Sequence, residues 1–118
     1  MLFRSEVLRV LHPALPSHPG HEIWRRDFSG ACGLFSVVLK PAPEERVRAF
    51  LNALKLFGLG VSWGGFESLV IPFDVTNGRS AVPWNPGGQA IRFHVGLEDV
   101  ADLIADLERG FSVFNEPR

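Results

Sequence analysis

The sequence predicts an α/β protein of the two-layer α+β type, in which a small, mainly antiparallel sheet carries helices on one face. Three observations support this fold class. The predicted elements follow the order β-α-β-α-β-β-α. Apolar residues recur at helical spacing in residues 44–57 and 99–109, whereas residues 90–95 alternate between apolar and polar as a strand does. With 118 residues, 46% of them hydrophobic, the chain is expected to form one domain with its own core.

Four segments are predicted to be strands. The segment at 32–39 is apolar, partly β-branched and too short for a typical helix, so we interpret it as a buried strand that includes Cys32 as a small buried hydrophobe. The connection at 73–89 is rich in Gly, Pro and Asn and is predicted to be irregular. The predicted strands are Glu6–His12, Cys32–Leu39, Glu67–Ile71 and Ala90–Val95.

Three helices are predicted between and after these strands. The first covers His21–Asp27, with Ser17 as a possible N-cap. The second follows Pro43 and extends to a stop at Gly58. The third covers Asp99–Arg109 and ends at Gly110, with Asp102, Asp106 and Glu108 pointing to solvent. Its predicted apolar stripe consists of Val100, Leu103, Ile104, Leu107 and the following Phe111.

Charge and cysteine content exclude several classes of protein. The formal net charge is −1 and no block of like charges occurs, so neither nucleic acid nor an anionic membrane is an expected partner. No run approaches the roughly 20 apolar residues of a membrane span. Cys32 is the sole cysteine, which suits a reducing cytoplasm. The spacing of His12, His18 and His21 matches no zinc pattern, so no metal site is predicted.

Four runs of residues together resemble the Cys/Met-metabolism pyridoxal-phosphate (PLP) enzymes. They are VLHPALPSHPGH at 10–21, WRRDFSGA with GLFS at 24–36, LFGLGVSWGGFESL at 56–69 and IRFHVGLED at 91–99. The runs keep the order in which that family has them, and the resemblance covers nearly the whole chain. Trp63, directly after Ser62, is similar to the β-lyase branch of the family, where γ-acting relatives more often carry a smaller residue.

This resemblance implies that residues 1–118 are the C-terminal domain of an enzyme with the aspartate-aminotransferase fold. The implied enzyme has an upstream domain that holds PLP, forms homo-oligomers, and cleaves the carbon–sulfur bond of cystathionine or a related L-cysteine S-conjugate by β-elimination. Two alternatives stay open. One is a γ-acting relative, of the γ-synthase or γ-lyase type. The other is a stand-alone binding or dimerisation module without catalysis.

The resemblance also implies where the site residues lie. The lysine that binds PLP belongs to an upstream motif, and neither Lys40 nor Lys55 has the context of that motif. The chain also contains no Tyr to stack on the cofactor. We therefore expect no catalytic, cofactor-binding or metal-binding residue in this chain, and no activity from the chain alone.

Arg92, Ser62 and Trp63 are the predicted substrate-binding residues. The resemblance places Arg92 at the substrate α-carboxylate, and strand alternation independently puts it opposite Ile91 and Phe93. Ser62 is expected to contact the substrate near that carboxylate, and Trp63 to form a wall of the pocket. His94 shares the face of Arg92, and we interpret it as a hydrogen-bonded structural residue.

Overall fold

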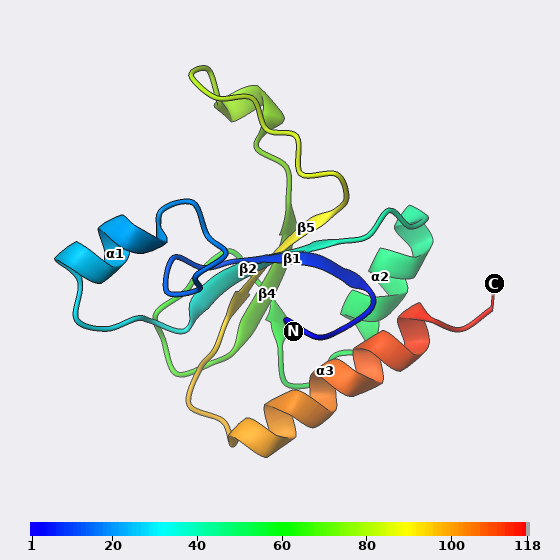
Figure 1. Ribbon diagram of the computed structural model, residues 1–118. Coiled ribbons are helices and arrows are strands. Elements are labelled where there is room, and N and C mark those ends of the chain that lie inside the picture. Colours follow the sequence, from blue (N-terminus) through cyan, green and yellow to red (C-terminus); the bar gives the residue numbers. More distant parts are fainter. Residues whose placement is uncertain (118) are drawn as a thin grey trace.

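The computed structural model describes residues 1–117, which form one five-stranded sheet and three α-helices (Figure 1). A short 3-10 turn, η1, covers Thr76–Gly78 within the irregular connection predicted at 73–89. The strands are β1 (Val7–Leu11), β2 (Leu34–Leu39), β3 (Gly58–Leu59), β4 (Leu69–Phe73) and β5 (Ala90–His94), and the helices are α1 (His21–Asp27), α2 (Glu44–Ala53) and α3 (Val100–Phe114).

The sheet has the strand order β1-β2-β5-β4-β3, so β5 lies at its centre. The pairs β1–β2, β2–β5 and β5–β4 are antiparallel, and the two-residue strand β3 adds to β4 in parallel. This arrangement confirms the predicted, mainly antiparallel sheet. Strand β3 was not predicted, because two residues are too few to show an alternating pattern.

Helices α2 and α3 cover one face of the sheet, and the core lies between these helices and the sheet (Figure 1). Val37 and Ile91 are paired across β2 and β5, and both are fully buried on this face. Phe57 packs edge-on against Phe93 at a ring-centroid distance of 5.4 Å. Such aromatic contacts add to the stabilisation that comes from removing apolar surface from water. The predicted placement of helices on one face is therefore confirmed for α2 and α3.

Helix α3 runs through Gly110 to Phe114, so the predicted end at Gly110 is wrong. At Gly110 the helix lies very close to α2: a Cβ atom there would be 2.8 Å from the ring of Phe50 and 2.9 Å from the side chain of Leu54. The glycine is thus required by packing and not by a helix stop. The stripe is also narrower than predicted, because Val100 and Ile104 are exposed.

Helix α2 ends earlier than predicted, at Ala53. Leu54 is already extended, with φ −70° and ψ 137°, so the helix does not continue to Gly58. Helix α1 has no buried residues, and its N-cap is Gly20 without a side-chain cap, so Ser17 does not cap it. Cys32 is exposed and precedes β2, which contradicts its predicted burial.

Candidate functional site

The face of the sheet that α2 and α3 leave uncovered carries Arg92 and His94 on the central strand β5. Both side chains lie opposite Ile91 and Phe93, as the alternation predicted. Register places Arg92 between Ser36 of β2 and Ile71 of β4. Arg92 is half-buried, whereas His94 is buried.

A loop from Gly60 to Glu67, here called the 60–67 loop, connects β3 to β4 and lies against these two side chains. The guanidinium of Arg92 donates a hydrogen bond to the carbonyl oxygen of Val61. The N–H of Gly64 donates to Nδ1 of His94 at 3.3 Å, and Nε2 of His94 donates to the carbonyl oxygen of Gly65 at 2.9 Å. Gly64 has φ +85°, a conformation that favours glycine, and so permits the turn that faces His94.

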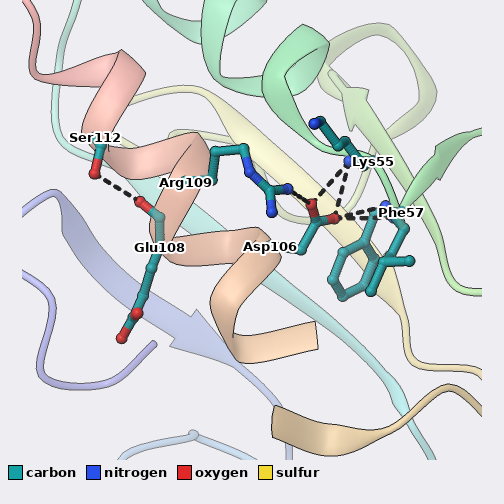
Figure 2. A network of polar contacts seen from close by, with 7 residues as sticks. Lys55, Phe57, Asp106, Glu108, Arg109 and Ser112 are labelled. Carbon is teal, nitrogen blue, oxygen red and sulfur yellow. Dashed lines mark hydrogen bonds and ion pairs between the residues drawn. The ribbon is translucent and has the colours of Figure 1, made fainter. Parts of the chain in front are cut away.

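The connection from α2 to β3, which precedes the 60–67 loop, is held by a buried carboxylate on α3 (Figure 2). Asp106 accepts hydrogen bonds from the backbone N–H groups of Lys55 at 2.8 and 3.1 Å, Leu56 at 2.8 Å and Phe57 at 3.2 Å, and it also pairs with Arg109. Its side chain is 1% exposed, so the predicted solvent-facing position of Asp106 is wrong. The three N–H groups follow the extended Leu54 at the end of α2, and Asp106 satisfies them where the helix no longer can.

The far end of the 60–67 loop is fixed by a second polar cluster. The hydroxyl of buried Ser68 donates to Glu98 at 2.7 Å and accepts from the N–H of Gly96 at 2.8 Å, while the N–H of Ser68 donates to Glu98 at 2.9 Å. The N–H of Leu97 donates to the carbonyl oxygen of Phe66. Donation by the N–H and hydroxyl of Ser68 holds the pKa of the Glu98 carboxyl below its ordinary value.

Ser62 and Trp63 lie in the 60–67 loop between the contacts made by Arg92 and His94. Both are exposed, and 60% of the surface of Trp63 is accessible. The structure therefore brings the three predicted substrate-binding residues to one loop and one strand. His94 lies on the same face as Arg92 and is hydrogen-bonded, as its spacing of two residues from Arg92 and its expected structural role predicted. Its partners, Gly64 and Gly65 of the 60–67 loop, were not predicted.

The arrangement can bind an anion. A guanidinium has five N–H donors, and of the interactions found in the described residues 1–117, Arg92 uses the one to Val61. The remaining fork is suited to a carboxylate in two-point contact. Among the same residues, no cluster of His, Cys, Asp or Glu has the geometry to hold a metal ion.

The two lysines do not fit a PLP site. Lys40 and Lys55 are both exposed, and neither lies on β5 or in the 60–67 loop. Lys55 lies beside Asp106 on the helix side, where its backbone N–H and not its ammonium group makes the contact (Figure 2). PLP functions only when protein groups hold and tune it. Neither lysine therefore offers an anchor for PLP beside Arg92 on the uncovered face of the sheet.

Comparison with known proteins defines the class to which this fold and site belong. The chain is 53% identical over 107 residues to cystathionine beta-lyase of Bordetella avium, covering 88% of this chain and 26% of the relative. It is 48% identical over 111 residues to cystathionine beta-lyase MetC of Escherichia coli strain K12, covering 91% and 28%. The chain thus spans little more than a quarter of the length of these relatives.

Solved structures and a family model agree with this class. The crystal structure of cystathionine gamma synthase from Xanthomonas oryzae pv. oryzae, in complex with aminoacrylate and cysteine, matches with a TM-score of 0.80 and 32% identity, over 95% of this chain and 30% of that one. The fold is therefore that of a portion of a PLP-dependent enzyme of the aspartate-aminotransferase type. Residues 3–112 match the model of the Cys/Met metabolism PLP-dependent enzymes. The chain belongs to this family.

The same family membership accounts for the pyridoxal-phosphate dependence that the sequence resemblance implied. Within residues 1–117, no helix is both long enough and apolar enough to cross a bilayer.

Proposed function

We propose that this chain is the substrate-positioning C-terminal domain of a PLP-dependent carbon–sulfur β-lyase that acts on cystathionine or related L-cysteine S-conjugates. The observation that carries the proposal is the position of Arg92. It lies in the middle of β5, on the face opposite the core, with part of its guanidinium held by Val61 and the remainder free to bind. Such a preset cation is what recognition of an amino-acid carboxylate needs.

Ser62 and Trp63 complete the proposed substrate site. They lie between Val61, which Arg92 contacts, and Gly64, which His94 contacts, so their backbone is held near the guanidinium. Exposed Trp63 offers a large apolar wall for the rest of the substrate. In this proposal Ser62 contributes a hydroxyl or backbone contact near the carboxylate, and no residue of the chain transfers a proton.

The remaining parts of the enzyme belong to the proposal as well. An upstream domain supplies the lysine and the other groups that hold PLP, which serves as the electron sink for the reaction. The greater length of the relatives supports this division. Self-association is supported by Ile23, Trp24 and Phe28, which line one largely apolar hollow beside α1, because a contiguous exposed apolar surface often marks an interface. The free, exposed Cys32 suits the proposed cytoplasmic setting.

A γ-acting enzyme is the second candidate function. The observation in its favour is the TM-score of 0.80 with a cystathionine gamma synthase. Sequence similarity favours the β-lyase, because identity is 48–53% with the two β-lyases and 32% with that synthase. Direct comparison of cystathionine cleavage products separates the two: a β-lyase releases homocysteine, whereas γ-elimination releases cysteine.

The test of the proposed function is Arg92→Lys in the full-length protein that contains this chain. Lysine keeps the positive charge but lacks the planar fork. Loss of a two-point contact with a desolvated carboxylate costs about 2–5 kcal/mol, which corresponds to a loss of roughly 30- to 5,000-fold in kcat/KM. Steady-state kinetics with an L-cysteine S-conjugate and with its decarboxylated analogue measures this loss, which should nearly vanish for the analogue.

A matched control is Arg25→Lys, because Arg25 is an exposed arginine on α1 paired with Glu22 at 2.8 Å, away from the sheet. This variant should leave kcat/KM unchanged. If Arg92→Lys loses less than a few-fold, or loses equally on both substrates, Arg92 does not bind the carboxylate. A full-length protein without a PLP-binding domain would instead support the stand-alone binding module.

A further inference from the structure

His94 holds the 60–67 loop through both nitrogens of one imidazole ring. Its Nδ1 accepts from the N–H of Gly64, and its Nε2 lies 2.9 Å from the carbonyl oxygen of Gly65. The ring is buried, with 7% of the residue's surface accessible, so water competes little for these two contacts. One side chain thus fixes two successive peptide groups of the loop.

The two contacts require a particular protonation state. An N–H group can donate only to an unprotonated ring nitrogen, so Nδ1 carries no proton, and Nε2 must carry the proton that is donated to Gly65. The ring is therefore neutral and in the Nε2–H tautomer. The opposite tautomer would set two donors against each other at Gly64 and two acceptors against each other at Gly65.

Arg92 and His94 contact different parts of the 60–67 loop. Arg92 contacts Val61 at one end, His94 contacts Gly64 and Gly65 at the other, and Ser62 and Trp63 lie between. The polar clusters around Asp106 and Ser68 fix the chain outside this stretch. In the part of the chain that the structure describes, the side-chain contacts that hold residues 61–65 thus come from two residues of β5, two positions apart.

We propose that His94 is a positioning residue for the substrate carboxylate: it sets the backbone of Ser62 and Trp63 so that, with Arg92, they form a site that is in place before the amino acid binds. The proposal rests on the proposed function, which assigns the carboxylate to Arg92. His94 itself does not touch the substrate. It acts by holding the loop and so lowers the ordering cost of binding.

The first experiment tests the hydrogen bonds between His94 and the loop and needs no measurement of enzyme activity. Nitrogen-15 NMR of the 118-residue chain reports the tautomer of His94, and amide hydrogen exchange reports protection of Gly64. We expect the Nε2–H tautomer. In His94→Leu, which removes both contacts, exchange at Gly64 should be about 10-fold faster. In His94→Gln, whose amide offers an acceptor and a donor, protection should largely return.

A matched control is His21→Leu. His21 also makes a backbone contact, from Nδ1 to the carbonyl oxygen of Pro13 at 2.9 Å, but it lies on α1. This variant should leave exchange at Gly64 unchanged. An Nδ1–H tautomer in the parent chain, or unchanged exchange in His94→Leu, overturns the proposal. The tautomer measurement needs no variant, so it decides even if His94→Leu fails to fold.

The second experiment uses the full-length protein and separates KM from kcat. His94→Leu should raise KM for the carboxylate substrate about 10-fold with a smaller change in kcat, and His94→Gln should restore it. The decarboxylated analogue should be insensitive. An unchanged KM, with faster exchange at Gly64 and a carboxylate-dependent loss in Arg92→Lys, overturns the positioning role. If Arg92→Lys shows no carboxylate-dependent loss in kcat/KM, the proposed function is refuted, whereas the hydrogen-exchange result for His94 still holds.

Discussion

Replacing Asp106 with alanine should be among the most damaging single substitutions in this chain. The carboxylate of Asp106 accepts from three successive backbone N–H groups, at Lys55, Leu56 and Phe57, and pairs with Arg109 (Figure 2). Alanine removes every one of these partners at once. The loss should loosen the junction between α2 and β3, which precedes the 60–67 loop.

The expected loss of stability depends on whether each of the three N–H groups can bond to water in the Asp106→Ala variant. Lys55 and Leu56 are exposed, so water can replace the carboxylate at their N–H groups and the loss there is modest. Phe57 is 3% exposed, and its N–H stays unpaired at a cost of about 1–3 kcal/mol. Arg109 is 44% exposed and stays hydrated without its partner, so the loss comes mainly from the hydrogen bonds to the charged carboxylate, and we expect the unfolding free energy to fall by about 2–4 kcal/mol.

Urea unfolding followed by circular dichroism measures this change, with comparison at constant m-value. Asp106→Asn keeps one oxygen acceptor and should lose about half as much. Glu108→Ala, two residues further along α3 and exposed, is the matched control and should change stability by less than about 0.5 kcal/mol. If Asp106→Ala costs no more than Glu108→Ala, the carboxylate does not support this junction.

Two further predictions concern stability. Gly110→Ala should destabilise by about 1–3 kcal/mol despite the better helix propensity of alanine, because its Cβ would lie 2.8 Å from the ring of Phe50; an increase in melting temperature would contradict this. The Glu98 carboxyl has a lowered pKa, so its contribution is present above its unfolded-state pKa and is lost as the pH falls from about 4.5 through the lower folded-state value. Ser68→Ala removes a donor to Glu98, so the stability difference between parent and variant should shrink over that acid range, and a constant difference from pH 7 to 3 would refute the link.

The sequence was most informative in the helices and strands, where the spacing of apolar residues follows the period of the element. Alternation along residues 90–95 correctly placed Arg92 opposite Ile91 and Phe93, because side chains on a strand alternate between faces. Apolar spacing located α2 and α3. The roles of Arg92, Ser62 and Trp63 in substrate binding stay predictions.

Contacts between distant residues were what the sequence could not reveal. Asp106 looked like any charged residue on a solvated helix, and its burial depends on N–H groups about 50 residues earlier. The same contact holds the segment that directly follows the end of α2. Gly110 looked like a helix stop because glycine is common there, yet it fits the crossing of α3 over α2. In each case tertiary packing overrode a correct local preference.

The central position of β5 has a consequence for how the chain reaches this structure. Its pairing with β2 joins residues 34–38 to residues 90–94, so the middle of the sheet forms only when segments more than 50 residues apart come together. Topologies with such distant pairings fold slowly, because loop closure is unfavourable until the contacts form. The contacts of Arg92 and His94 with the 60–67 loop each span 29–31 residues, so the loop orders only once β5 has docked. Damage to β5 would thus remove the side-chain contacts that hold the 60–67 loop, even in molecules whose helices had already formed.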